Sequence, residues 1–458
     1  MSECNGTCEY VLDPDDSETW PDKEGDEFYK KGDDMENKHG LWNQNGVWTC
    51  SHDTKENEEY CIFHQPVEKK DDEEVVEAFL NLISKIKMRN SSGKQQEKLR
   101  LLGAQFGEFD LSRKSFAGCD INLRESTFFG DAVFRSTTFD GRVDFTSVKF
   151  EKKADFNGAE FESEADFSNG DFSKEAYFSS ACFRGIVEFS DVCFCANLHL
   201  WNATFKQKPV FWDVKFDKEA DFSAVKFEHG SDITATFDDK AKFIDARFEQ
   251  EPDFTGSTFN APAIFTDAKF KKRAEFRHVT FLGEAVFSMT EYLQGANFEQ
   301  VEFNRDAHFT GAIFDGDTSF SKGTLFNGNA DFTKTEFNAD TDFIGTEING
   351  NADFTEAVFD AELEFREADL TEAIFTDTTP HGGDFEKALL SRATLFGTDL
   401  RGAKLNGAVL GDVRIDEHTQ FLGHPDDDSD SSSHTLSAIR SKSHCVYDPN
   451  YKKKKQDG

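Results

Sequence analysis

The chain has 458 residues and a formal net charge of −37, which is enough length for several domains or for one extended repeat array. It contains 51 Phe against 4 Met and 9 Pro, so one large ring must fill one recurring position. No apolar run approaches the ~20 residues of a membrane-spanning helix, and the opening MSECNGTCEYVLDPDD does not look like a secretory signal. We therefore expect a soluble, cytoplasmic protein without a membrane segment.

Residues 1–70 form a candidate metal-binding module. The stretch WTCSHDTKENEEYCIFH (48–64) contains Cys50, Cys61 and His64, with His52 nearby and Cys4 and Cys8 upstream. Zinc prefers four tetrahedral thiolate or imidazole ligands, and Cys-x2-His offers one pair from a tight turn. The arrangement resembles small Cys3His zinc modules, which implies a structural zinc on Cys8, Cys50, Cys61 and His64, with Cys4 as the alternative first ligand. The other interpretation is a set of free thiols in a loosely ordered arm.

Residues 71–104 are predicted to contain an amphipathic helix and a linker that cap a solenoid. In DDEEVVEAFLNLISKIKM (71–88), apolar residues recur at helical spacing, with acids in the first turn and lysines in the last. The apolar positions are Val75, Val76, Phe79, Leu80, Ile83 and Ile86. A dimerisation helix, and with it a homodimer, is the weaker alternative.

From residue 105 to 421 the chain is a repeat array. Phenylalanines fall alternately five and six residues apart, as in ADFSNGDFSKEAYFSSACF (165–183), and Leu200, Ile233 and Ile348 replace Phe at single positions. One residue is missing near Phe237, one is added between Phe320 and Phe332, and from Phe365 the spacing becomes a strict five. The position demands bulk and apolarity rather than a phenyl ring as such.

Each repeat is predicted to be a very short strand. The residue two before each large one is small or β-branched, and positions i−2 and i share one face of an extended strand. Ser, Thr, Gly, Asn and Asp occupy the intervening positions, which is turn chemistry. A helix is disfavoured, because spacings of five and six would place successive rings about 140° apart.

The runs ADLTEAIF (368–375) and ATLFGTDLRGAKLNGAVL (393–410) resemble pentapeptide repeats, whose pattern is A-(D/N)-(L/F)-(S/T)-x. The resemblance implies an all-β solenoid: a right-handed, four-sided parallel β-helix in which each unit forms one side. Here it would carry an N-terminal helical cap and the small Cys/His module. Where the two spacings alternate, a coil would take two units of five and two of six. We hypothesise that the extra residues enlarge two of the four corners.

The last segment, 422–458, is polar and low in complexity and is predicted to be disordered. Its basic end, KKKK (452–455), could touch an acidic partner or nucleic acid, although a short basic end is more often only solvated. Within the repeats, Cys182, Cys193 and Cys195 occupy outward positions beside inward rings, and we expect exposed, reduced thiols there. Asp and Glu recur directly before many inward rings, and the simplest interpretation is a solvated ladder of carboxylates.

These features favour a non-enzymatic scaffold that presents a rigid acidic surface to an unidentified protein partner. No direct nucleic-acid binding is expected from the acidic rod. The acidity is interpreted as an adaptation to a salt-rich cytoplasm. The alternative is mimicry of DNA, because the family includes proteins that protect DNA gyrase, so the chain could bind or inhibit a topoisomerase. A basic cluster at Lys269, Lys271, Lys272, Arg273 and Arg277 disfavours mimicry. An enzyme is the weakest alternative, since paired carboxylates are the only acid–base groups that recur, and no cofactor beyond a structural zinc is expected.

Overall fold

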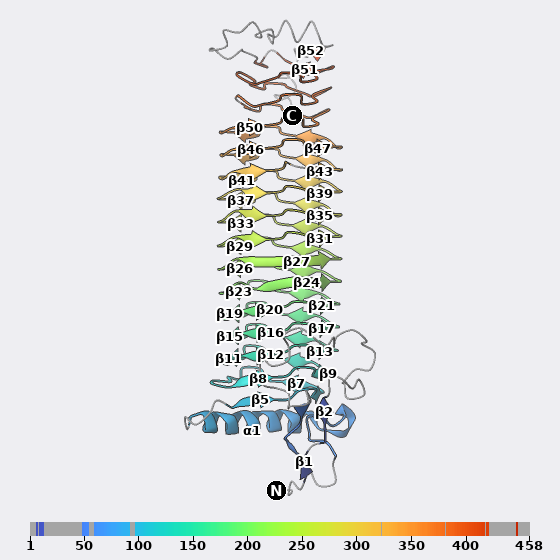
Figure 1. The fold of residues 1–458 in the computed structure, drawn as a ribbon, viewed down its shortest axis with the longest axis vertical. Helices are drawn as coiled ribbons and strands as arrows, with labels where there is room; N and C mark the ends of the chain where they lie inside the picture. The colour runs from blue at the N-terminus through green and yellow to red at the C-terminus, as the bar shows by residue number, and fades with distance from the viewer. Residues whose placement is uncertain are drawn as a thin grey trace, which may run out of the picture. The chain divides into compact units, whose positions relative to one another are not determined.

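The computed structural model describes residues 6–7, 9–12, 48–54, 59–91, 97–321, 323–380, 382–416, 418–420 and 446–447. They divide into two compact units, Met1–Asp217 and Lys218–Gly458. In each unit, short parallel strands stack coil upon coil, which confirms the predicted right-handed, four-sided β-solenoid (Figure 1). The rings that the spacing predicted to face inward are buried in both units.

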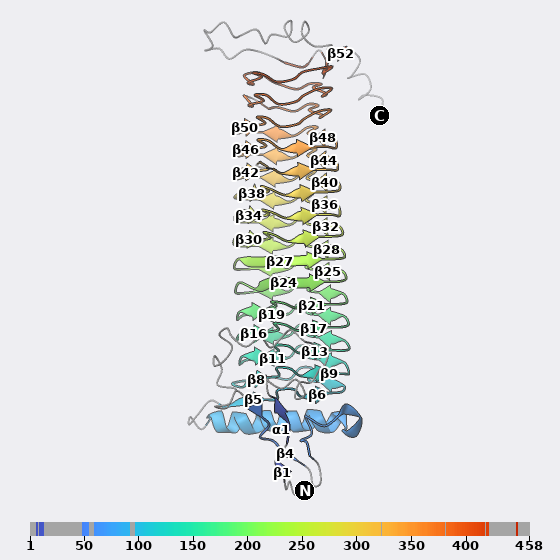
Figure 2. The ribbon, with the colours of Figure 1, turned by 45° about the vertical axis from the view of Figure 1, so that its right-hand side comes forward.

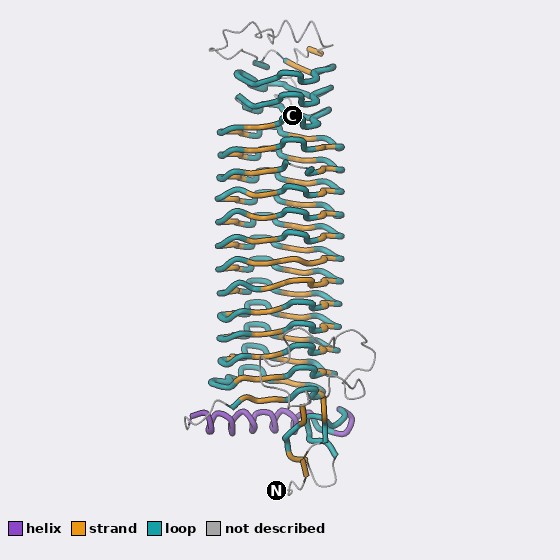
Figure 3. Tube along the Cα trace, viewed as in Figure 1, coloured by secondary structure: helices purple, strands orange, loops and turns teal. Residues whose placement is uncertain are grey.

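One coil of the first unit shows how the sequence builds the four faces. Face 1 is β12 (Val143–Asp144), face 2 is β13 (Lys149–Phe150), face 3 is β14 (Ala154–Asp155) and face 4 is β15 (Glu160–Phe161). Turns separate these two-residue strands, as the alternating colours of Figure 3 show. Each strand pairs in parallel with the equivalent strand of the next coil, for example Val143 with Ala165 and Phe161 with Phe183. One coil therefore takes two units of five residues and two of six, as the spacing predicted.

The first unit contains four such ladders and one longer strand. Face 1 comprises β5 (Lys98–Arg100), β8 (Asp120–Asn122), β12, β16 (Ala165–Asp166) and β20 (Val187–Glu188). Face 2 comprises β6 (Gln105–Phe106), β9 (Thr127–Phe128), β13, β17 (Asp171–Phe172) and β21 (Cys193–Phe194). Face 3 comprises β7 (Phe109–Asp110), β10 (Ala132–Val133), β14, β18 (Ala176–Tyr177) and β22 (Leu198–His199). Face 4 comprises β11 (Thr138–Phe139), β15, β19 (Cys182–Phe183) and β23 (Thr204–Phe205), and β24 (Val210–Phe216) runs across faces 1 and 2.

The second unit repeats the same four faces. Face 1 comprises β30 (Pro252–Asp253), β34 (Ala274–Glu275), β38 (Ala296–Asn297), β42 (Thr318–Ser319), β46 (Thr341–Asp342) and β50 (Leu363–Glu364). Face 2 comprises β31 (Thr258–Phe259), β35 (Thr280–Phe281), β39 (Glu302–Phe303), β43 (Leu325–Phe326) and β47 (Glu347–Ile348). Face 3 comprises β25 (Ala220–Asp221), β28 (Ala241–Lys242), β32 (Ala263–Ile264), β36 (Ala285–Val286), β40 (Ala307–His308), β44 (Ala330–Asp331) and β48 (Ala352–Asp353). Face 4 comprises β26 (Lys226–Phe227), β29 (Arg247–Phe248), β33 (Lys269–Phe270), β37 (Glu291–Tyr292), β41 (Ile313–Phe314), β45 (Glu336–Phe337) and β49 (Val358–Phe359).

The corners of these coils are of two alternating kinds. After faces 1 and 3 the chain closes a tight turn, in which Val148 N donates to Phe145 O and Ala159 N donates to Phe156 O. Each such turn holds one residue at positive φ, Ser147 at 56° and Gly158 at 64°. The corners after faces 2 and 4 contain the extra residue, as hypothesised from the spacing. There Gly185 is needed, because a Cβ would lie 2.2 Å from the backbone carbon of Ser163 in the preceding coil.

Both irregularities of the spacing fall at the corner between faces 1 and 2 of the second unit. At the missing residue, β27 (Ser231–Phe237) runs straight through the corner, with alternate residues buried. The coil there is one residue shorter, so that Ala220 lies opposite Ala241. At the added residue the coil is one residue longer, and Glu302 lies opposite Leu325. Changes in coil length therefore occur at the corners, and the inward rings remain on the same faces.

The core of each unit is made of columns of phenyl rings. Phe156 stacks on Phe134 and Phe178, with ring centroids 4.8 Å apart in both pairs. It meets Phe145 and Phe167 edge-on from the opposite side, at 5.7 and 5.6 Å. Stacked and edge-to-face pairs are both favourable for aromatic rings. The predicted stacking of each ring on its neighbours one coil away is confirmed.

Helix α1 (Asp72–Ser91) covers the open edge of the first coil, beside β5 (Figures 1 and 2). Val75, Phe79, Ile83 and Ile86 are buried, and the Phe79 ring meets Phe109 edge-on at 5.3 Å. Glu108 N donates to Asp72 Oδ2, and Lys87 Nζ donates to Ser115 O. The apolar face that a dimerisation helix would need therefore packs against the first coil of its own unit. In this position the helix caps the open strand edge and prevents strand addition.

In the strict five-residue section of the second unit, single parallel bridges replace two-residue strands. Each coil is two residues shorter there, so that Glu364 lies opposite Asp384. The last described coil contains β51 (Arg414–Ile415) and extends to Gln420, which forms a parallel bridge with Asp399. Within 422–458, the segment predicted to be disordered, the described residues are β52 (Val446–Tyr447), which pairs in parallel with β51.

Candidate metal centre

Paired strands precede α1 and carry the predicted Cys/His module. β1 (Gly6–Thr7) pairs antiparallel with β4 (Asp53–Thr54), and β2 (Val11–Leu12) pairs antiparallel with β3 (Trp48–Thr49). Cys50 directly follows β3, and its N–H donates to Tyr10 O at 3.0 Å. These pairings bring Cys50 close to a segment that is distant in sequence. No local sequence pattern could have predicted this proximity.

Three of the four predicted ligands come together. His64 N and Gln65 N both donate to Cys61 O, so Cys61-x2-His64 forms the tight turn expected of a ligand pair. Cys61 Sγ lies 3.2 Å from His64 Nδ1 and 3.8 Å from Cys50 Sγ. All three residues are buried, and their donor atoms lie within 4.8 Å of one another. Two thiolates bound tetrahedrally at about 2.3 Å from zinc would be about 3.8 Å apart, so the sulfur spacing fits zinc.

The orientation of His64 suits a metal ligand. Its Nε2 lies 2.8 Å from Leu102 O, a backbone carbonyl of the first coil. A carbonyl can only accept, so the hydrogen bond assigns the proton to Nε2 and leaves the Nδ1 lone pair facing Cys61. Ligating histidines are oriented in this way by a partner on the second nitrogen.

Aromatic packing also fixes the position of the His64 ring. Tyr10 stacks on it with a centroid distance of 4.1 Å and an angle of 5°. The Tyr10 hydroxyl rests against Gly103, whose φ is +66° and where a Cβ would lie 2.0 Å from that oxygen. Only glycine therefore fits at residue 103, and the ring of His64 is fixed between the module and the first coil.

A half-buried ammonium lies close to Cys61. Lys70 Nζ donates to Phe63 O at 3.2 Å and also to Gln105 O, linking the module to β6. Burial lowers the pKa of Lys70 to about 8, while the negative charges of Cys61 and Asp72 act in the opposite direction. An ammonium beside the site offsets part of the negative charge that two thiolate ligands bring to a metal.

The sequence offered two candidates for the fourth ligand position. Cys8 and Cys4, the two residues predicted for that position, lie outside the described residues. His52, which the sequence placed near the motif without a role, has its Nδ1 3.2 Å from Cys50 Sγ. Its spacing of two from Cys50 is the only sequence signal that could have drawn attention to it.

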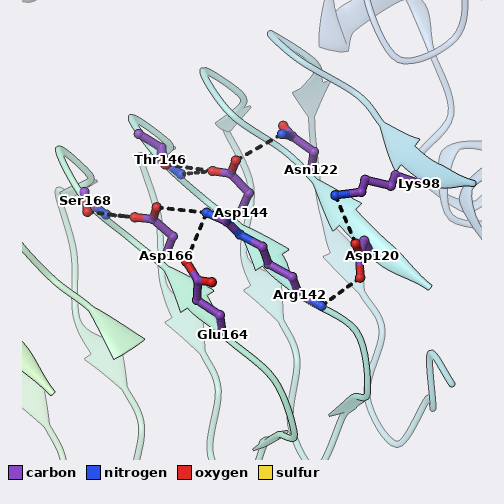
Figure 4. A network of polar contacts seen from close by, with 9 residues as sticks. All are labelled: Lys98, Asp120, Asn122, Arg142, Asp144, Thr146, Glu164, Asp166 and Ser168. Carbon is purple, nitrogen blue, oxygen red and sulfur yellow. Dashed lines mark hydrogen bonds and ion pairs between the residues drawn. The ribbon is translucent and has the colours of Figure 1, made fainter. Parts of the chain in front are cut away.

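The recurring carboxylates were interpreted as a solvated ladder, and the structure gives them a structural role instead. Asp144 Oδ1 accepts from Thr146 N at 3.1 Å, and Asp166 Oδ1 accepts from Ser168 N at 3.0 Å (Figure 4). The same bond, from residue i+2 to the side chain of i, recurs at Asp110, Asn122, Asp155, Asp221, Asp253, Asn297, Asp331, Asp342, Asp353, Asp369, Asp384 and Asp399. Asp and Asn both offer this oxygen, which explains why either is found at the position.

Ion pairs link the outward side chains of successive coils. Arg142 reaches Glu164 at 3.1 Å and Asp166 at 3.6 Å on face 1, and Lys98 reaches Asp120 at 3.2 Å (Figure 4). Four residues of the basic cluster are also paired. Lys269 pairs with Glu291 and Lys271 with Glu249 in a neighbouring coil, whereas Arg273 and Arg277 pair with Glu275 of their own coil. The cluster therefore interrupts the acidic surface less than the sequence suggested.

Among the residues that the structure describes, no helix is both long and apolar enough to cross a membrane.

Family models support the repeat assignment. Family models described as pentapeptide repeats match residues 145–192, 233–280, 276–324, 322–369 and 381–412. No curated protein matches the chain. Among solved structures, HetL, a pentapeptide repeat protein involved in heterocyst differentiation regulation from the cyanobacterium Nostoc sp. strain PCC 7120, is 14% identical with a TM-score of 0.13. That match covers 71% of this chain and 92% of HetL.

QnrB1, a plasmid-mediated fluoroquinolone resistance protein, is 16% identical with a TM-score of 0.17, and the match covers 46% of this chain and 93% of QnrB1. The family matches fall on the coils in which an inward ring, a preceding small residue and a capping Asp or Asn recur. The chain therefore belongs to the pentapeptide repeat family.

Proposed function

We propose that the protein is a non-enzymatic interaction scaffold whose N-terminal module is fixed by a structural zinc. The observation that supports the scaffold is the registered outward surface of each unit. Side chains one coil apart lie directly above one another, and ion pairs such as Lys269–Glu291 at 2.5 Å hold them in columns. Such columns present charges to a partner protein at a fixed spacing, with little to order upon binding.

The zinc is proposed to bind Cys50 Sγ, Cys61 Sγ and His64 Nδ1, with Cys8 as the fourth ligand. These three ligands carry the proposal because they are buried, correctly spaced and joined to the first coil through Leu102. A closed four-ligand site stabilises a fold and leaves no position for a substrate. The module would thus secure α1 and the Cys/His turn over the first coil rather than catalyse a reaction.

Metal content of the full chain tests the zinc. We expect Cys61→Ser to bind one zinc fewer per chain than the wild type, whereas the matched control Cys182→Ser, which changes a half-buried thiol on face 4, should bind as much zinc as the wild type. Replacing zinc with cobalt should give a thiolate-to-cobalt absorption band in the wild type. A wild-type chain that is purified and titrated without retaining any metal would contradict the site.

The same measurement identifies the fourth ligand. Cys8→Ser should lower zinc affinity strongly, and Cys4→Ser and His52→Asn should leave it near the wild-type value. If His52→Asn has the larger effect, His52 replaces Cys8 in the assignment.

The acidic surface is proposed to keep the protein hydrated and folded at high salt. A net charge of −37 repels itself at low ionic strength, and salt screens that repulsion. The unfolding temperature of the full chain should therefore rise between about 0.1 and 1 M KCl, where the Debye length falls from about 10 to 3 Å. If the unfolding temperature falls as the KCl concentration rises over this range, the proposed salt adaptation is rejected.

The partner is proposed to be a protein with a basic surface. Affinity capture with the full chain at near-native salt should enrich one basic protein in stoichiometric amount, and its recovery should fall as salt rises. The topoisomerase alternative predicts that purified protein reduces supercoiling by gyrase. If large molar excess has no effect on supercoiling, that alternative is discarded while the scaffold remains.

A further inference from the structure

Two thiols of the first unit form a pair that the N-terminal module does not explain. Cys193 and Cys195 flank Phe194, whose ring is buried in the core, so both thiols point outward from the same side of the strand. Their sulfurs lie 2.8 Å apart. Both residues are half-buried, which differs from the fully exposed thiols expected from the sequence.

Carboxylates of the neighbouring coils surround this pair. The register places Asp171 beside Cys193 on one side and Lys215 beside it on the other. Asp171 Oδ1 lies 3.7 Å from Cys195 Sγ. A carboxylate oxygen of Asp217 lies within 4.8 Å of both sulfurs. Lys215 Nζ lies 2.6 Å from Asp217 Oδ1 and holds that carboxylate beside the thiols.

We propose that Cys193, Cys195 and Asp217 form a binding site for a thiophilic divalent cation of the zinc and cadmium class. Two sulfur ligands and one carboxylate oxygen are a donor set that such ions accept, and Asp171 adds negative charge next to the site. On binding, two S–H bonds break, two metal–sulfur bonds form and two protons leave to solvent. The sulfurs must separate to about 3.8 Å, which outward side chains can do by χ1 rotation.

The thiols are poorly suited to the main alternative, a reactive nucleophile. Burial raises the pKa of both Cys193 and Cys195, and the charges of Asp171 and Asp217 raise both further. Protonated thiols are weak nucleophiles at neutral pH, whereas a bound cation displaces their protons.

Cadmium titration of the full chain, kept reduced with a phosphine, tests the site. Equilibrium dialysis gives the number of ions bound, and ultraviolet thiolate-to-cadmium absorption reports the sulfur ligands. The wild type should bind one more Cd²⁺ than the Cys193→Ser/Cys195→Ser variant, and Cys182→Ser should match the wild type. Because Cys50→Ser/Cys61→Ser removes only the N-terminal ligands, it should still bind the ion at Cys193 and Cys195, whether or not the N-terminal zinc exists.

A second variant keeps both thiols. Asp217→Asn should weaken cadmium binding at least about tenfold, and Asp171→Asn should weaken it less. The Cys193→Ser/Cys195→Ser chain should keep the far-ultraviolet circular dichroism of the wild type, since serine replaces cysteine at outward positions. The site is rejected if the double variant binds as many Cd²⁺ ions, with the same affinity, as the wild type, or if Asp217→Asn leaves the affinity unchanged.

Discussion

Two kinds of coil occur within the second unit, and they differ in width and in core. Up to Phe365, units of five and six residues alternate, and the inward residues are mostly Phe. Beyond it every unit has five residues, each coil is two residues shorter, and Leu fills most inward positions, as at Leu390 and Leu395. We call these the wide and the narrow coils. A wider coil encloses more volume, and larger rings are needed to fill it to the density of a protein interior.

The turns change together with the core. In the wide coils a residue at positive φ recurs every eleven residues: Asp245, Gly256, Asp267, His278, Met289, Gln300 and Gly311. In the narrow coils it recurs every five: Glu367, Glu372, Asp377, Gly382, Lys387, Arg392, Gly397, Gly402, Gly407 and Asp412. Two of the four corners of a wide coil contain one extra residue in place of this tight turn. The length of the corners thus sets the width, and the width selects the side chain in the core.

The largest expected effect comes from emptying a wide coil. Phe265 stacks on Phe243 at 4.7 Å and on Phe287 at 4.9 Å and meets Phe254 and Phe276 edge-on. Phe265→Ala should lower the free energy of unfolding by about 3–5 kcal/mol, measured by urea denaturation. Leu395→Ala in a narrow coil should destabilise less, by about 2–3 kcal/mol, because it leaves a smaller cavity. Equal losses would mean that width does not govern the core.

Exchanging the two side chains tests whether each coil accepts only its own size. Leu395→Phe should overpack a narrow coil and destabilise by about 1–3 kcal/mol. Phe265→Leu should leave a small cavity in a wide coil and destabilise by a similar amount. Hydrogen exchange of the neighbouring coils locates each effect. If Leu395→Phe leaves the free energy of unfolding unchanged, the narrow coils have spare volume, and coil width does not select the side chain in the core.

Tyr292 is an imperfect substitute for Phe in a wide coil. Its ring stacks on Phe270 and Phe314, but within the described part of the chain its buried hydroxyl has no hydrogen-bond partner. Tyr292→Phe should raise the free energy of unfolding by about 1–2 kcal/mol, measured by urea denaturation.

The pH dependence of the same substitution gives an independent check. Burial raises the pKa of Tyr292 well above its ordinary value. The unfolded chain would ionise above about pH 10 while the folded chain stays neutral, so this group lowers stability as pH rises above that value. Tyr292→Phe should remove this part of the alkaline loss, seen as a smaller difference in stability between neutral and high pH.

The smallest effect should be the same in both kinds of coil. Asp253 in a wide coil and Asp369 in a narrow coil each accept a hydrogen bond from the backbone N–H two residues on. Replacing either with Ala should destabilise by about 1 kcal/mol, because the bond is local to one face. Asp253→Asn should retain the wild-type stability, as Asn297 makes the same bond to Glu299 N. A much larger loss at Asp369 would show that the caps also depend on coil width.

Much of the fold was predictable because its signal is periodic. The spacing of the rings identified the inward positions, and the resemblance to pentapeptide repeats implied four faces. Together they predicted the corners that hold the extra residue. The same period could also have placed Asp171 and Asp217 near Cys193 and Cys195, since residues about one coil apart in sequence are neighbours in space. What the pattern did not show was the role of the carboxylates before the rings, because an outward position by itself does not distinguish a solvated side chain from a turn cap.

Sequence alone was sufficient to specify how this chain winds, because a repeated pair of small and large apolar residues can be buried together only if every unit turns the same way. The metal centre was decided by the tertiary structure. Cys50, Cys61 and His64 have no period, and the carbonyl of Leu102 that orients His64 belongs to a coil 38 residues further along. Antiparallel pairing of distant strands and packing against the first coil brought these groups together, and such contacts depend on where the chain returns in space rather than on local spacing.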